Sequence, residues 1–69
     1  MNRATFRKKL VEATGGCAIQ HDGWPCNSCF HELFSHDEWL AVLAYRGDYP
    51  ELPRNDKVLT ELSKKLLSL

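Results

Sequence analysis

The sequence has no excess of charge of either sign, because nine Lys and Arg balance nine Asp and Glu. A strong nucleic-acid binder is usually basic overall, so this balance disfavours that class. Long apolar runs are also missing, since none approaches the ~18 residues that span a membrane. The N-terminal segment is charged and lacks the apolar stretch of a secretion signal. We therefore expect a cytoplasmic protein with no membrane partner.

Cysteine does not occur in an even number. The three residues are Cys17, Cys26 and Cys29. An odd number cannot close a complete set of internal disulfides, which argues against a secreted disulfide scaffold. In a reducing compartment, clustered cysteines are more often metal ligands or redox groups.

Alternating strand patterns are missing as well, and their absence bears on a redox role. The stretch "WPCNSC" at 24–29 resembles the tryptophan-flanked Cys-x-x-Cys pair of the thioredoxin family, which would imply thiol–disulfide exchange. Here, however, the proline precedes the pair, and that family's fold needs βαβ units that this chain has no strands to build. No nucleophile or phosphate-binding glycine loop accompanies the histidines. We expect no enzymatic activity.

Helical patterns account for most of what is present. Residues 2–16 repeat apolar side chains at helical spacing and end in a Gly-Gly pair that suits a left-handed helix end. A second helix begins at Ser35, which can form a capping box with Glu38. Gly47 is its natural end. Residues 30–34 are expected to form a short helical turn before it.

A third helix begins near Asn55 and carries leucines spaced three or four residues apart. The expected fold class is mainly α: a small three-helix domain over residues 1–69. An irregular zinc-binding loop or short hairpin, turning at Asp22-Gly23, joins the first two helices. The predicted core is apolar and aromatic: Trp24, Phe30, Phe34, Trp39 and Leu43 beside the metal, with Phe6, Leu10, Leu59, Leu62 and Leu66 completing it.

A cysteine–histidine cluster is the clearest chemical motif. Cys17, His21, Cys26 and Cys29 fall within thirteen residues. Thiolate and imidazole are ligands that zinc favours, and four of them complete a tetrahedral structural site. The two-residue gap between Cys26 and Cys29 lets one tight turn aim both sulfurs at one ion. These four residues are the predicted metal ligands.

The fourth ligand is the open part of this prediction. An extended arm from Cys17 would place His21 about 13 Å away, so the chain must curl between them. His36 lies in the first turn of the second helix and can reach back, whereas His31 points away from Cys29 if a helix starts there. Water, Asp22 or no fourth ligand are the remaining alternatives.

The plain alternative to a metal is that the cysteines are small buried hydrophobes, as free cysteines often are. A core this small rarely contributes more than ~3–5 kcal/mol. Structural zinc contributes an apparent ~10–16 kcal/mol in zinc-finger peptides. The expected cofactor is therefore Zn2+, which would stabilise the single domain.

Two short stretches resemble proteins outside the zinc and redox families. "HDGWPCNSCF" and "RGDY" are similar to segments of small uncharacterised reading frames in archaea, bacteria and phages. The two quoted stretches make up 14 of the 69 residues. The resemblance implies no particular activity and fits a reduced cytoplasmic setting.

The function we expect is a small structural-zinc interaction module that binds a protein partner or a second copy of itself. The apolar end of the last helix and the lack of overall positive charge favour this. The alternative is nucleic-acid binding through basic residues of the first and last helices. The possible contacts are Arg3, Arg7, Lys8 and Lys9, joined by Lys57, Lys64 and Lys65 if those helices lie side by side.

Overall fold

Four α-helices and one short 3-10 helix make up the fold. The computed structural model describes residues 2–68, apart from the side chain of His21. The helices are α1 (Arg3–Ala13), η1 (His21–Gly23), α2 (Asn27–Leu33), α3 (His36–Arg46) and α4 (Asp56–Leu67). The mainly helical class is confirmed. The structure adds a full helix, α2, where the sequence indicated only a short turn.

The helix ends are set by local interactions. Asn2 begins α1 by accepting a hydrogen bond from the backbone N–H of Thr5. Ser35 and Glu38 form the predicted capping box at the start of α3. Gly47 ends α3 with a left-handed φ of 82°, which costs glycine little.

The connection between α1 and α2 is irregular. Asp22 and Gly23 both have left-handed backbones, with φ of 63° and 80°. An isolated antiparallel bridge joins Gln20 to Trp24, with the Gln20 N–H donating to the Trp24 carbonyl at 3.0 Å. The predicted hairpin is therefore reduced to this single bridge, and residues 2–68 contain no β-strand.

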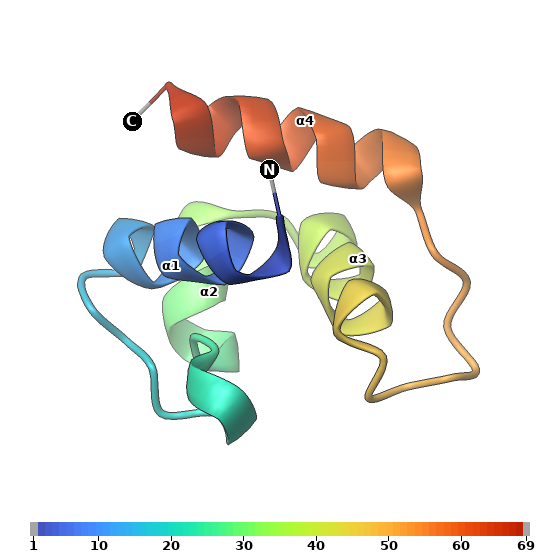
Figure 1. Ribbon diagram of the computed structural model, residues 1–69, viewed down its shortest axis with the longest axis horizontal. Helices are drawn as coiled ribbons and strands as arrows, with labels where there is room; N and C mark the ends of the chain where they lie inside the picture. Colours follow the sequence, from blue (N-terminus) through green and yellow to red (C-terminus); the bar gives the residue numbers. More distant parts are fainter. Residues whose placement is uncertain (1, 69) are drawn as a thin grey trace.

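Helix α4 lies across α1 and α3, and α2 packs against α3 (Figure 1). The first and last helices therefore do lie side by side. Most of the predicted core is buried, but Phe34, Trp39 and Leu43 are only half-buried. On α3 the buried apolar residues are Ala41 and Val42. The buried apolar residues are Phe6, Leu10, Trp24, Phe30, Ala41, Val42, Leu59, Leu62 and Leu66.

The charged residue Glu38 is buried between α3 and α4. Its carboxylate accepts hydrogen bonds from the Ser35 N–H at 2.8 Å and from the Lys65 ammonium at 3.0 Å. Burial alone would raise the pKa of Glu38, but the bonds from Ser35 and Lys65 outweigh it and leave the pKa below its usual value. Glu38 therefore completes the capping box of α3 and also forms an ionic contact with α4.

Replacing Glu38 with Gln is expected to lower the free energy of unfolding by about 1–2 kcal/mol near neutral pH. A carboxyl whose pKa is depressed by folding stabilises the protein above its unfolded pKa, and this contribution is lost as pH falls through the folded value. The variant should therefore lose less stability than wild type on acidification below about pH 4.5. Urea unfolding across that range measures it, with the exposed Glu61→Gln as control. If the free energy of unfolding fell equally with pH in wild type and in Glu38→Gln, the prediction would be contradicted.

Among the helices of residues 2–68, none is long and apolar enough to cross a membrane.

Candidate metal centre

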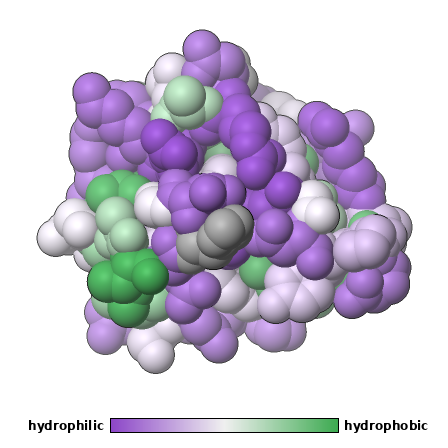
Figure 2. Space-filling view, turned by 60° about the horizontal axis from the view of Figure 1, so that its bottom comes forward, coloured by the Kyte–Doolittle hydropathy of each residue, from purple (hydrophilic) through white to green (hydrophobic). Residues whose placement is uncertain are grey.

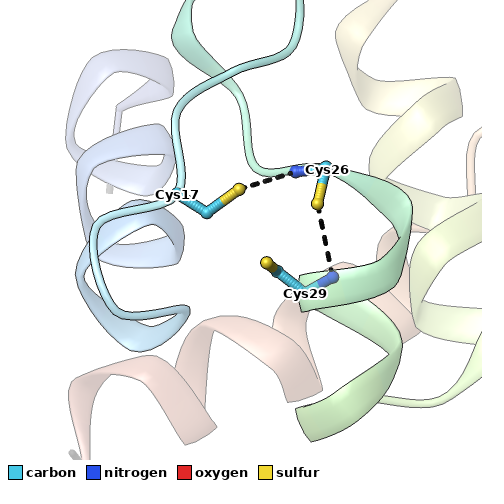
Figure 3. A group of neighbouring side chains, drawn as sticks. All are labelled: Cys17, Cys26 and Cys29. Carbon is cyan, nitrogen blue, oxygen red and sulfur yellow. Dashed lines mark hydrogen bonds between the residues drawn. The ribbon is translucent and has the colours of Figure 1, made fainter.

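Three cysteine side chains converge on one point between α1 and α2. Cys17 comes from the loop after α1, Cys26 caps the start of α2, and Cys29 lies in the first turn of α2 (Figure 3). All three sulfurs lie within 4.8 Å of one another, and all three residues are half-buried. Sulfurs bound to one tetrahedral zinc at 2.3 Å are about 3.8 Å apart, so only a small contraction is needed. The cluster can hold a metal ion.

Backbone N–H groups already point at two of the sulfurs. The N–H of Cys26 donates to the Cys17 sulfur at 3.4 Å, and the N–H of Cys29 donates to the Cys26 sulfur at 3.4 Å. Such donors favour a thiolate over a thiol. The bond from the Cys26 N–H is the main cause that lowers the pKa of Cys17.

The third thiol behaves in the opposite way. Hydrogen bonding to the sulfurs of Cys26 and Cys17, followed by burial and repulsion from those two groups, raises the pKa of Cys29 to about 12. Three negative sulfurs this close repel one another, so the last proton is held strongly when no cation is present. A divalent cation removes that repulsion, and we expect its binding to release protons from the cluster.

Trp24 anchors the cysteine loop to the helices. Its indole is buried, and guanidinium groups lie over it from Arg3 at 5.3 Å and from Arg46 at 5.5 Å. Arg3 also donates to the backbone carbonyls of Tyr45 and Arg46 at 3.0 Å, which ties the start of α1 to the end of α3. Because Trp24 and the buried Pro25 directly precede Cys26, this anchor fixes how the chain approaches the metal centre.

A second arginine holds the turn of the same loop. The Arg7 guanidinium donates to the backbone carbonyl of Asp22 at 2.9 Å. Arg3 and Arg7 were both candidates for nucleic-acid contacts, and both guanidinium groups are bonded to backbone carbonyls of their own chain. Of the other two candidates, Lys8 is exposed and Lys9 is half-buried.

The histidines do not complete the cluster within the part of the chain that the structure describes. No fourth His, Cys, Asp or Glu side chain joins the three cysteines there. His31 and His36, both considered as ligands, instead contact each other, with 3.1 Å between Nε2 of His31 and Nδ1 of His36. The side chain of His21 lies outside the described residues, so its role as fourth ligand stays a prediction.

The supporting residues Arg3 and Arg46 were not identified from the sequence as parts of this site. They act on Trp24 across long sequence separations, and no short-range motif signals such a contact. Comparisons with protein-family models, curated proteins and solved structures found no match to this chain.

Proposed function

We propose that this chain is a small structural-zinc module that binds a protein partner and has no enzymatic activity. The observation that carries the proposal is the convergence of Cys17, Cys26 and Cys29 within 4.8 Å. Thiolates are soft ligands that select zinc over hard cations such as magnesium or calcium. A thiolate that is bound to zinc is not available as a free nucleophile. Zinc binding by the three cysteines therefore supports a structural role.

The partner surface that we propose lies on the cysteine loop. Ile19, two residues after Cys17, is 78% exposed, the highest exposure among the large apolar side chains of the described chain. Much of the face in Figure 2 is hydrophilic, with apolar residues gathered at one side. The loop that carries Ile19 is fixed at one end by Cys17 and at the other by Trp24. A metal-held loop can present an apolar side chain at little entropic cost.

The end of the last helix gives weaker support for a partner. Leu66 is buried in the core, so it is not available, while Leu67 is 66% exposed. Leu69 lies outside the described residues. Leu67 is less exposed than Ile19 and lies at the end of a helix, whereas the loop of Ile19 is fixed at both ends, so the loop is the better candidate.

Nucleic-acid binding is the second candidate, and the packing of α1 beside α4 is the observation that favours it. That packing places Lys8 and Lys9 on a helix that contacts the one carrying Lys57 and Lys64. Lys65 is paired with Glu38 across the α3–α4 contact, so it contributes less free positive charge.

The two candidates differ in their response to salt. We expect zinc-loaded protein, with one zinc per chain by elemental analysis, to show no salt-sensitive binding to short DNA or RNA at about 50 and 200 mM salt. Affinity capture with wild type and with Ile19→Ser should recover a protein that only the wild type retains. Fluorescence anisotropy and mass spectrometry measure the two results.

The opposite outcome is equally specific. Salt-sensitive nucleic-acid binding that disappears in a Lys8→Ala, Lys9→Ala double variant would favour the second candidate. These lysines suit the test better than Arg7, because removing Arg7 would also release the Asp22 turn.

A further inference from the structure

Two histidines meet at the corner between α2 and α3. Nε2 of His31 and Nδ1 of His36 are 3.1 Å apart, and the two exposed rings stack with centroids 5.3 Å apart. His31 lies in the last turn of α2, and His36 is the first residue of α3. The pair is separate from the three-cysteine cluster.

A neighbouring carbonyl assigns the protons of this pair. Nδ1 of His31 lies 2.9 Å from the backbone carbonyl oxygen of Asn27. A carbonyl only accepts, so Nδ1 of His31 carries a proton, and Nε2 of the neutral ring keeps its lone pair. His36 then donates from Nδ1 to that lone pair. A backbone carbonyl that binds the far nitrogen of a histidine is the usual support of a metal-ligating imidazole.

The spacing of the two nitrogens also fits a metal ion. Nitrogens bound at about 2.0–2.1 Å, with angles between 90° and 109° at the ion, are about 2.8–3.4 Å apart. The observed 3.1 Å lies inside that range. Both rings are exposed, so they can rotate until their lone pairs converge.

We propose that His31 and His36 form a second metal site, for a divalent transition-metal ion of the Ni2+, Cu2+ and Zn2+ group. The ion takes the lone pair of Nε2 of His31 and that of Nδ1 of His36, whose proton moves to Nε2 of the same ring. Water completes the coordination. Imidazole ligands suit these ions, whereas thiolate ligands favour softer metal ions. The short helix α2 therefore contributes ligands to two metal sites with different preferences.

The surrounding charge supports the proposal. Residues 17–38 carry Asp22, Glu32, Asp37 and Glu38 and neither Lys nor Arg, a sum of −4. Glu38 is paired with Lys65 from α4. Glu32 and Asp37 are the sequence neighbours of the two histidines, and their carboxylates raise the local concentration of cations.

Ni2+ added to the zinc-loaded protein tests the site, because its paramagnetism broadens nearby NMR signals. Substoichiometric Ni2+ should broaden the ring resonances of His31 and His36 before those of His21. Calorimetric titration should give one Ni2+ per chain, with affinity falling roughly 100-fold in His36→Asn, since one imidazole lacks the chelate advantage. Asn keeps a side-chain amide donor near the position of Nδ1, so loss of the hydrogen bond alone does not explain such a fall.

Ser28→Ala is the matched control, because Ser28 is an exposed, uncharged residue of the same helix, and it should bind Ni2+ as wild type does. Circular dichroism of each variant checks the fold, and the wild-type NMR result stands without any variant. Equal Ni2+ affinity in His36→Asn and wild type would overturn the proposal. Broadening confined to residues beside the cysteines would also overturn it.

Discussion

Removing zinc with a strong chelator is expected to cost most of the helical circular dichroism signal and to expose Trp24 and Trp39 to water. Ligand binding to the folded state contributes about 4 kcal/mol at a free concentration near a thousand times Kd. A core of this size contributes about 3–5 kcal/mol, so losing the ion removes a comparable amount. Chelator titration followed by circular dichroism and tryptophan emission measures the effect, and added zinc should reverse it.

Cys26→Ser is expected to reproduce the effect of chelation without chelator. Cys26 is one of the three proposed ligands, and its sulfur also caps α2 by accepting from the Cys29 N–H. Ser28→Ala changes an exposed position between Cys26 and Cys29. This variant should keep the zinc content and the free energy of unfolding of wild type. Spectra that do not change at saturating chelator, together with three freely titrating thiols, would show that the helices fold without a metal.

Trp24→Ala is the second change with a large expected effect, and it should lower the free energy of unfolding by about 3–5 kcal/mol. The indole is buried and packs edge-on against Phe6, with ring centroids 6.4 Å apart. The guanidinium groups of Arg3 and Arg46 also lie over its ring. Removing it leaves a cavity and releases the chain just before Cys26, so zinc affinity should fall as well. Urea unfolding and competition with a chromophoric chelator measure the two effects.

Trp39→Ala is the matched control, because Trp39 is the second tryptophan and is only half-buried. Its loss should cost less stability and leave zinc affinity close to that of wild type, since its ring packs against Phe30 and His31. Trp24→Phe keeps an aromatic face for the two arginines and should fall between wild type and Trp24→Ala. Equal losses in Trp24→Ala and Trp39→Ala would contradict the anchoring role of Trp24.

Local signals in the sequence were sufficient to predict the three longer helices, α1, α3 and α4, and the cluster of three cysteines. A capping residue, an apolar repeat or a two-residue gap between cysteines acts over a few positions, so Ser35, Gly47 and Cys26 could be identified by inspection. The short helix α2 was underestimated because seven residues offer too few turns for a periodic pattern. Its packing against α3, through Phe30, is tertiary and leaves little trace in local propensity.

The contacts that the sequence did not predict join distant segments. Arg3 and Arg7 stand on a face of α1 whose positive charge indicated a solvent-exposed or phosphate-binding surface. Both guanidinium groups instead bond to backbone carbonyls of other elements. Glu38 was expected only as a helix cap, and its ion pair with Lys65 depends on how α3 and α4 cross. Charge alone does not tell whether a side chain meets solvent or its own fold.

The contacts of Trp24 with Arg3 and Arg46 also bear on the order in which the chain becomes ordered. Arg3 and the carbonyl of Arg46 that it binds are 43 residues apart in sequence. Contacts between distant residues form late, because closing a long loop costs entropy before the contact is gained. During synthesis the three cysteines leave the ribosome before Arg46 does. The growing chain therefore passes through a stage in which every thiol is present and the indole anchor is still incomplete.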